Sequence, residues 1–259
     1  MSRALAGVDL LIGIDDTDDL RSPGTGRRAR SLLQELTAAL LGNAAGATRH
    51  QLLVDDRIPY TSHNSSACLL WRSASHDPGS VLNDVIELAG RFLERVCPPA
   101  ADPGLVVAVP SRVDDVAALV EFGQRAKREV LCTRDARELA ARLGIHLSGH
   151  GGTQDGVLGA LAAVGLFLSG NDGLFITLPG LYDLPGEATI DDLYARIPLD
   201  DARDDCHRRP GTGDLIELGD WVHPVLLEGR SVLLLDRPRE CRDGRQVWRT
   251  APRAVVKQH

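Results

Sequence analysis

Near its start the chain reads Leu10-Leu11-Ile12-Gly13-Ile14-Asp15-Asp16-Thr17-Asp18-Asp19. The apolar half of this stretch predicts a buried strand, and the acids lie where that strand should end. Carboxylates packed so closely repel one another, most strongly where water is scarce. A hard cation such as Mg2+, which carboxylates hold together with substrate phosphates, would relieve that repulsion.

A turn of small residues follows the acids and leads into a helix. It reads Ser22-Pro23-Gly24-Thr25-Gly26 and is followed by Arg27 and Arg28. Strand, acidic cluster, turn and helix together predict a metal–phosphate site at the end of the strand. The candidate metal ligands are Asp15, Asp16 and Asp18, and the candidate nucleotide contacts beside them are Thr17, Gly24 and Gly26.

Two other interpretations of the acidic run stay open. Asp and Thr after a strand often only cap a turn or the next helix. The D-x-D-x-T pattern of phosphatases is a rival, and it fits poorly because Leu20 occupies the threonine place after Asp16 and Asp18.

Composition limits the kinds of protein this can be. The 259 residues suffice for one large domain or two smaller ones, and 43% hydrophobic residues are enough to build a core. The formal net charge is −7, whereas nonspecific nucleic-acid binders are normally basic. Any RNA contact must therefore be local. Two runs would offer basic patches, or would simply be solvated surface: Arg27, Arg28 and Arg30, and Arg203, Arg208 and Arg209.

The five cysteines are Cys68, Cys97, Cys132, Cys206 and Cys241. None forms a C-x-x-C pair, which argues against a structural zinc ribbon. The odd count and the lack of a signal peptide predict reduced thiols and a cytoplasmic protein. No apolar run is long enough to span a bilayer, and residues 157–168, which contain two glycines, predict a buried helix.

Hydrophobic periodicity predicts an α/β (α+β) fold with a mixed sheet and flanking helices. Domain boundaries follow from a change of character at Gly170: we expect one domain over residues 1–169 and a smaller, strand-rich α+β domain over residues 170–259. The expected helices are residues 27–42, 80–96, 113–128, 133–143, 157–168 and 190–196. The expected strands are residues 10–14, 51–54, 67–71, 105–109, 174–178, 215–218, 225–227 and 232–235.

A second glycine-rich loop covers residues 148–156, directly before the apolar helix. Glycines let backbone N–H groups approach a ligand, and a helix start favours negative charge. Phosphate binding is one interpretation and a tight turn that serves packing is the other. The loop does not have the P-loop spacing, and no lysine follows it. Its candidate contacts are Gly151, Gly152, Thr153, Asp155 and Gly156; for Asp155, helix capping is at least as good an explanation.

The polar strip of residues 61–66 adds two candidates. His63 and Asn64 would contact a base or a phosphate, although Asn and Ser are more commonly turn residues. A serine–histidine–aspartate hydrolase is a further option, which the lack of a G-x-S-x-G elbow disfavours.

Four stretches of this chain resemble the TiaS family, the archaeal 2-agmatinylcytidine synthetases that modify an isoleucine tRNA. Gly13-Ile14-Asp15-Asp16-Thr17-Asp18 looks like the family signature G-I-D-D-T-D, and three stretches follow in the family's order. These are residues 57–67, Asp102-Pro103-Gly104-Leu105-Val106-Val107, and Gly156-Val157-Leu158-Gly159-Ala160-Leu161-Ala162-Ala163. The resemblance covers residues 8–168, the kinase-like catalytic domain of that family.

The resemblance weakens beyond residue 170, and some positions depart from the family. The second domain would correspond to the family's ferredoxin-like domain, with His223 in place of a cysteine in its C-P-V-L segment. We expect no counterpart of the family's OB-fold and zinc ribbon, which hold the tRNA. Thr25 is the one residue that matches the family's C-T-T segment, where a threonine accepts phosphate. Of the R-G-N-G motif only Asn64 remains.

The resemblance implies an ATP- and Mg2+-dependent enzyme. In the family, ATP phosphorylates a cytosine carbonyl oxygen and the amine of agmatine then displaces the phosphate. We therefore expect a ligase-like or kinase-like enzyme that activates a carbonyl or hydroxyl acceptor, with Asp15, Asp16, Asp18 and Thr25 as its catalytic residues. An agmatine-like amine could be ligated next. The acceptor is a tRNA or nucleobase, or a small molecule. The alternatives are a nucleotide-binding sensor or subunit without catalysis, and a metal-dependent phosphohydrolase.

Overall fold

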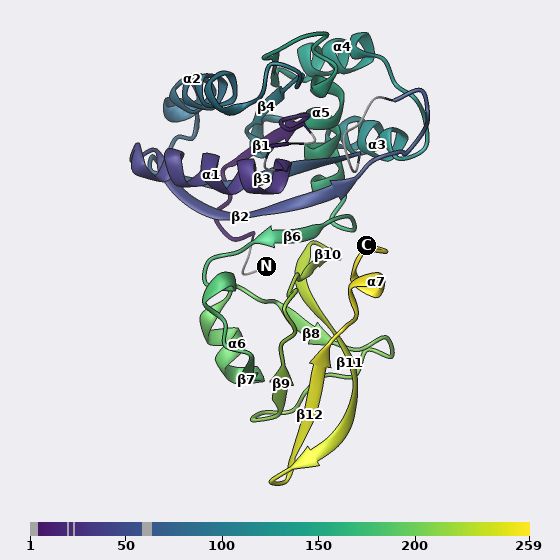
Figure 1. Cartoon of the computed structure of the whole chain (residues 1–259). Coiled ribbons are helices and arrows are strands. Elements are labelled where there is room, and N and C mark those ends of the chain that lie inside the picture. Colours follow the sequence, from purple (N-terminus) through teal and green to yellow (C-terminus); the bar gives the residue numbers. More distant parts are fainter. Residues whose placement is uncertain (1–4, 20, 23, 59–63) are drawn as a thin grey trace. The chain divides into compact units, whose positions relative to one another are not determined.

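The computed structural model describes residues 5–19, 21, 22, 24–58 and 64–259. The chain divides into two compact units, Gly7–Ser169 and Gly170–His259, and the second also includes Leu5 and Ala6 (Figure 1). Among the described residues, every helix is too short or too polar to traverse a lipid bilayer.

The unit Gly7–Ser169 is built on one sheet with the strand order β5-β4-β1-β3-β2. Each pairing described between these five strands is antiparallel. The strands are β1 (Leu10–Asp15), β2 (Gly42–Gln51), β3 (Ser65–Ser73), β4 (Gly104–Ala108) and β5 (His146–Gly149). β1 is therefore the central strand, and its five apolar or glycine residues Leu10 to Ile14 are all buried.

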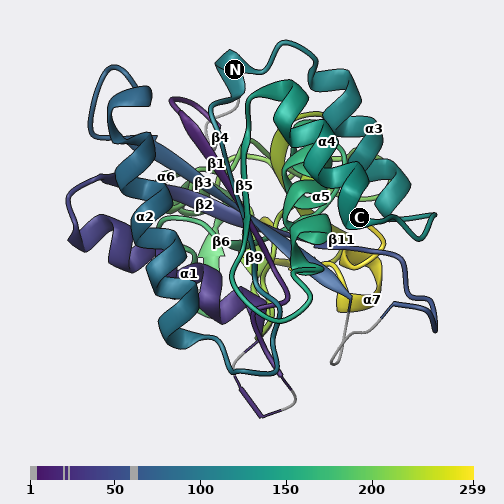
Figure 2. The ribbon, with the colours of Figure 1, turned by 90° about the horizontal axis from the view of Figure 1, so that it is seen from above.

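Helices cover both faces of this sheet (Figure 2). The two on one face contact each other, and the other face is covered by a helix that contacts β1, β3 and β4 and carries two further helices. The first pair is α1 (Thr25–Ala38) and α2 (Gly79–Val96), and the second group is α5 (Gly156–Leu168) with α3 (Val116–Ala126) and α4 (Thr133–Leu143). A short 3-10 turn, Pro110–Arg112, follows β4.

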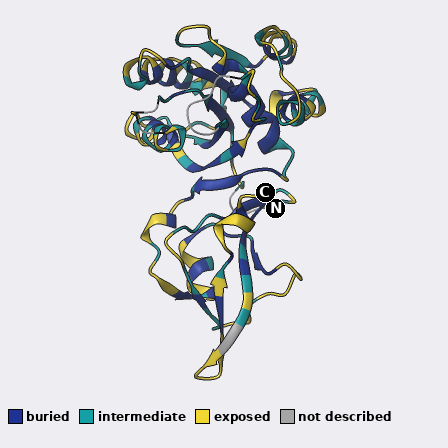
Figure 3. Ribbon diagram, turned by 45° about the vertical axis from the view of Figure 1, so that its right-hand side comes forward, coloured by how far each residue is buried: buried dark blue, intermediate teal, exposed yellow. Residues whose placement is uncertain are grey.

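α5 is apolar all round because it lies between the sheet and two other helices, and eleven of its thirteen residues are buried. Glycines allow the close approach. A Cβ on Gly13 of β1 would lie 2.1 Å from the carbonyl oxygen of Ala160, and a Cβ on Gly165 would lie 2.0 Å from that of Leu119. Figure 3 shows buried residues concentrated in the strands, with exposed residues on the outer surfaces of the helices.

The unit Gly170–His259 is rich in short strands. Its described ladder runs β6-β10-β11-β12-β9-β7, with β8 beside β11. β8 pairs with β11 in parallel and β9 pairs with β12 in parallel, so this part of the sheet is mixed. The strands are β6 (Leu174–Thr177), β7 (Glu187–Thr189), β8 (Asp201–Arg203), β9 (Leu215–Glu217), β10 (Val225–Leu227), β11 (Arg230–Arg242) and β12 (Arg245–Thr250). The helices are α6 (Ile190–Arg196) and α7 (Arg253–Val256), with a 3-10 turn at Leu181–Asp183.

The predicted α/β (α+β) class, with a mixed sheet and flanking helices, is confirmed. The strand predicted at residues 51–54 is wrong: the strand is Gly42–Gln51, and the chain leaves it at Leu52. Its glycines, alanines and asparagine have low intrinsic strand preference, so pairing along β3 rather than local preference forms this strand. The sequence analysis also missed β5, β7, β8 and β12.

We expect Gly13→Ala to destabilise the unit Gly7–Ser169 by about 2–3 kcal/mol, because the new methyl group would collide with the α5 backbone and one of the two elements would have to move. The measurement is urea unfolding followed by circular dichroism. The control is Gly24→Ser, whose Cβ would meet its nearest neighbour at 3.9 Å; we expect a change below about 1 kcal/mol there. Equal stability of the two variants would contradict the packing described for α5.

Candidate functional site

Antiparallel pairing brings three chain segments together at the end of β1. Asp15, the last residue of β1, pairs with Gly104 at the start of β4, and Ile14 pairs with Ala67 near the start of β3. The residues that lead into β3 and β4 therefore lie beside the acids that follow β1. The sequence predicted those acids at the strand end, and the sheet adds Asp102 to them.

A cavity of about 850 Å³ opens at this place. Its lining combines acidic residues with an apolar wall. The acidic residues that line it are Asp15, Asp16, Asp18, Asp19, Asp102, Glu129 and Asp155, and the apolar ones are Leu52, Ile58, Ala100, Ala126, Val130, Leu131 and Leu158. One side of the cavity thus carries dense negative charge, and another side is suited to an apolar ring.

Asp15 is the deepest of the acids. Its carboxylate points at α5, where a Cβ on Gly159 would lie 1.7 Å from Oδ2. Burial raises the pKa of Asp15 to about 7; a hydrogen bond from the backbone N–H of Asp16 lowers it, and the charges of Asp16 and Asp18 raise it. At neutral pH this carboxyl is therefore only partly ionised unless positive charge reaches it.

Asp16 is held in an uncommon backbone conformation, with φ of 49°. Non-glycine residues seldom adopt the left-handed region, and when they do a functional site is a frequent reason. Burial raises the pKa of Asp16 to about 6, assisted by the charges of Asp102, Asp18 and Asp155, while a hydrogen bond from the backbone of Asp102 opposes the rise. Neighbouring carboxylates that raise one another's pKa are the electrostatic condition that a cation relieves.

Asp18 and Thr25 form a hydrogen-bonded pair at the start of α1. The Thr25 hydroxyl donates to Asp18 Oδ1 at 3.0 Å, and the buried Thr17 hydroxyl donates to Thr25 Oγ1 at 3.2 Å. Gly24 is the N-cap residue of α1, and Gly26 lies in its first turn. α1 has no side-chain cap and no acid in its first turn, and its first residue, Thr25, lines the cavity.

The second glycine-rich loop contributes its last residues to the cavity. Asp155 and Gly156 line it, whereas Gly151 and Gly152 pack against residues 101–103. The capping interpretation of Asp155 is wrong: it occupies the N-cap position of α5 but makes no capping hydrogen bond. Instead Thr153 Oγ1 lies 2.6 Å from Asp102 Oδ2 and 2.7 Å from Asp155 Oδ2.

Asn64 lines the cavity, and His63 lies outside the described residues. The Asn64 side-chain amide donates to the carbonyl oxygen of Leu53 at 2.6 Å, and its backbone carbonyl accepts from Leu52. Asn64 is therefore tied to the residues that follow β2. The turn interpretation of the polar strip stays a prediction, because residues 61–63 lie outside the described residues.

Sequence reasoning missed three kinds of site residue. Asp102 was noticed only within the stretch Asp102-Pro103-Gly104; it precedes a valine-rich strand by two residues, whereas Asp15 ends its strand. Arg21 and Arg57 also line the cavity, and Arg57 pairs with Asp55 at 2.8 Å. The apolar residues of the cavity form no recognisable sequence motif, because they come from several separate segments of the chain.

Asp15, Asp16, Asp18, Asp102 and Asp155 line one cavity, and all five offer carboxylate oxygens, the ligand type that Mg2+ prefers. In the described structure they do not form a group whose ligand atoms all lie within 4.8 Å of one another, so a bound cation would have to draw these side chains together. The pKa values of Asp15 and Asp16 are raised first by burial and further by the charges of neighbouring acids, so positive charge brought to this place would favour their ionised forms.

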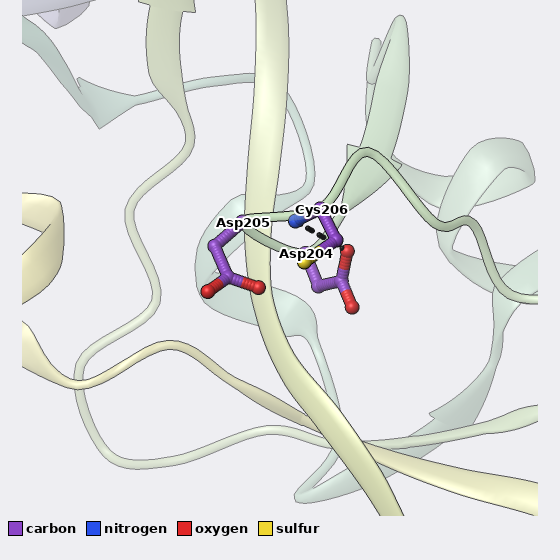
Figure 4. Close-up of side chains that lie close together, drawn as sticks. All are labelled: Asp204, Asp205 and Cys206. Carbon is purple, nitrogen blue, oxygen red and sulfur yellow. Dashed lines mark hydrogen bonds between the residues drawn. The ribbon is translucent and has the colours of Figure 1, made fainter.

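A second acidic group lies in the unit Gly170–His259. Asp204, Asp205 and Cys206 bring one ligand atom each within 4.8 Å of one another (Figure 4). Asp204 is already satisfied: Oδ1 accepts from the backbone N–H groups of Cys206 and Arg208, and Oδ2 accepts from the Arg208 guanidinium at 2.8 Å. Hydrogen bonds and ion pairs within the turn account for this cluster without a metal.

The same turn changes the interpretation of one basic patch. Arg208 pairs with Asp204, and Arg209 forms two hydrogen bonds of 2.7 and 2.9 Å to Asp201. Arg203 is only 8% exposed and lies near Asp201 and Glu228. These three arginines therefore neutralise acids of their own unit. In the other patch, Arg28 Nε is buried and has no hydrogen-bond partner.

Comparison with known proteins shows a likeness of fold. The chain resembles TiaS in its complex with tRNA and ATP, with 23% identity and a TM-score of 0.52, covering 61% of this chain and 36% of that one. It resembles a tRNA fluorescent labelling enzyme with 24% identity and a TM-score of 0.50, covering 60% and 35%. It also resembles TiaS in its complex with tRNA, AMPCPP and agmatine, with 22% identity and a TM-score of 0.50; the match covers 61% of this chain and 36% of that one.

These matches give the chain a TiaS-like fold, and they span only about a third of the length of those proteins. No protein-family model matches the chain. No curated protein matches it either.

We expect Asp15→Asn to be more stable than the wild type at pH 8 in EDTA, by on the order of 1 kcal/mol. The raised pKa means that the folded state binds more protons than the unfolded state between pH 4 and 7, so wild-type stability falls as pH rises through that window. The asparagine cannot ionise and escapes this loss. Thermal unfolding at pH 5, 6, 7 and 8 measures the difference, which should grow with pH.

The control for this series is Glu87→Gln, which removes an exposed acid of α2 (64% side-chain exposure) and should follow the wild type at every pH. Lower stability of Asp15→Asn than of the wild type at pH 8 would show that a positive group of the protein already compensates Asp15.

Proposed function

We propose that the unit Gly7–Ser169 binds a magnesium–nucleoside triphosphate, ATP in the first instance, and transfers its terminal phosphoryl group to a carbonyl or hydroxyl acceptor. The observation that carries this proposal is the meeting of several carboxylates with an apolar wall in one cavity of about 850 Å³. The TiaS-like fold supports it, since structures of that fold have been solved with ATP and with AMPCPP and agmatine.

The metal would be held by Asp15, Asp16 and Asp18. When bound, Mg2+ neutralises charge on the phosphates of the nucleotide. Asp15 and Asp16 are suited to this role because burial already opposes their ionisation, so that they gain most from a neighbouring cation. Asp102 adds charge beside Asp16 and would complete the set of oxygen ligands.

The apolar wall would receive the base of the nucleotide. Leu52 and Ile58 follow β2, and Val130 and Leu131 lie between α3 and α4. Val130 is 41% exposed in the described structure, a fraction that a planar base stacked in the cavity would reduce. Burial of such apolar surface contributes binding energy at about 25 cal/mol per Å².

The phosphate end would lie near two helix starts. α1 and α5 begin at the cavity edge with Thr25 and Gly156, and the N–H groups of a first helical turn favour an anion. Arg21, at the same edge, would add positive charge. Gly151 and Gly152 would then act by bringing the second loop against Asp102 rather than by touching phosphate.

Thr25 would accept the phosphoryl group in one step of the reaction, as its match to the family's C-T-T segment implies. Its hydroxyl already donates to Asp18 Oδ1 at 3.0 Å, so a base stands beside the oxygen. The Thr25 oxygen would attack the terminal phosphorus as the bond to the bridging oxygen breaks. ADP would leave, and the hydroxyl proton would pass to Asp18.

The final acceptor would be a nucleobase of an RNA or a small molecule with a comparable carbonyl. An agmatine-like amine would displace the phosphate from it, with Asp155 as a carboxylate that can contact the amine. Recognition of a whole tRNA would require surfaces beyond those assigned here.

The first test is binding and turnover of ATP. We expect calorimetry to show uptake of ATP with Mg2+ and at least tenfold weaker uptake with EDTA or in Asp15→Asn, which corresponds to about 1.4 kcal/mol. Incubation with radiolabelled ATP should place phosphate on Thr25, and Thr25→Val should abolish it. Glu87→Gln is again the matched control, since it removes an acid remote from the cavity.

The alternatives give different results in the same experiment. Tight magnesium-dependent binding without phosphate on Thr25 and without ADP release under any acceptor would favour a nucleotide-binding subunit. Phosphate release from non-nucleotide esters would favour a phosphohydrolase. No uptake of nucleotide by the wild type would overturn the proposal.

A further inference from the structure

A chain of polar side chains connects the edge strand β5 with helix α2. His146 and Ser148 lie on β5, His150 directly follows it, and the fourth member, Glu94, lies near the end of α2. None of the four lines the acidic cavity. His150 packs closely against α2, because a Cβ on Gly90 would lie 2.8 Å from its ring.

The distances along this chain are those of hydrogen bonds. Ser148 Oγ lies 2.9 Å from His150 Nε2 and 2.9 Å from His146 Nε2. His150 Nδ1 lies 3.0 Å from Glu94 Oε1. A hydroxyl in contact with an imidazole that a carboxylate orients is the arrangement by which serine nucleophiles are activated.

The direction of the protons follows from the carboxylate. Glu94, when ionised, only accepts, so His150 Nδ1 carries a hydrogen and donates it to Glu94. In the neutral ring His150 Nε2 is then an acceptor, and the Ser148 hydroxyl donates to it. The remaining lone pairs of Ser148 Oγ face His146 Nε2, which therefore donates. The donor and acceptor assignments are thus mutually consistent, and the Ser148 hydroxyl donates its proton to His150 Nε2.

We propose that Ser148 is the nucleophile of a second site that transfers acyl groups from carboxylic esters to water, with His150 as general base and Glu94 as the residue that positions His150. His146 Nε2 donates to the same oxygen and so keeps the Ser148 hydroxyl proton directed at His150. β5 is the edge strand of its unit among the described residues, and an edge strand presents backbone N–H groups of the kind that an oxyanion requires.

The reaction balances with water as the second reactant. Ser148 Oγ attacks the ester carbonyl carbon while its proton moves to His150 Nε2. The bond to the alkoxy oxygen breaks, and His150 returns the proton to the departing alcohol. Water then attacks the acyl group on Ser148, giving up a proton to His150. The carboxylic acid leaves, and the proton on His150 restores the Ser148 hydroxyl.

This site falls within the loop of residues 148–156 that the sequence marked for its glycines. The expected hydrolase signal was a G-x-S-x-G elbow, which the chain lacks. Here the serine lies on β5, and its base follows two residues later, directly after the strand. The third member comes from a helix far away in sequence, so spacing alone did not reveal the group.

The test is covalent labelling with an alkyl fluorophosphonate, which phosphonylates activated serines and releases fluoride. We expect mass spectrometry of the labelled full-length chain to find the reagent on Ser148, with Ser80, an exposed serine of α2, as the internal control. His150→Ala should slow labelling by roughly 100-fold, as loss of a general base does. Hydrolysis of p-nitrophenyl acetate should fall in parallel.

The labelling rates of two Glu94 variants distinguish a role in positioning His150 from a purely structural role. Glu94→Ala should slow labelling markedly, whereas Glu94→Gln, whose amide oxygen still accepts from His150 Nδ1, should retain more of the rate. Circular dichroism confirms that each variant is folded, and His150→Asn replaces His150→Ala if the latter unfolds. Glu87→Gln, which removes an exposed acid of α2 that belongs to neither site, should label like the wild type.

Two outcomes would overturn the proposal. One is labelling of Ser148 in the wild type no faster than that of Ser80. The other is labelling of Ser148 that folded His150 variants leave unchanged.

Discussion

The close approach of α5 to β1 is the constraint on which the rest of the candidate site depends. Gly13 lets the helix backbone rest on the central strand, and Gly159 leaves the space into which the Asp15 carboxylate points. A carboxylate in that position is removed from most of its water. The acidity of the site is therefore set by helix packing as much as by the number of acids.

Antiparallel pairing then determines which groups surround Asp15. The starts of β3 and β4 are brought to the end of β1, so Asn64 and Asp102 arrive at the cavity from distant parts of the sequence. α1 and α5 both begin at this edge. Acidic side chains and the N-terminal ends of two helices therefore lie at the same edge. The carboxylates could bind a metal ion, and the helix ends favour the anion that the metal carries.

Sequence reasoning located the acidic half of this arrangement and not the apolar half. The strand before Asp15 and the buried helix after Gly156 carry strong local patterns, because each is apolar over its full length. β2 carries no such pattern: its residues are small or polar, and its partner β3 makes it a strand. Leu52, Ile58 and Val130 likewise become a wall only through the tertiary fold. Asp102 was accessible in principle, since it lies two residues before a strand with a strong apolar pattern.

The contact between Gly159 and Asp15 also has an evolutionary consequence. Any side chain at position 159 would push the carboxylate out of its place, and the reason to keep the position empty disappears once the acid is lost. The two positions should therefore change together among descendants of this chain. A descendant that keeps Asp15 but carries a larger residue at position 159 would retain the acidic sequence motif without the carboxylate position on which the proposed metal site depends.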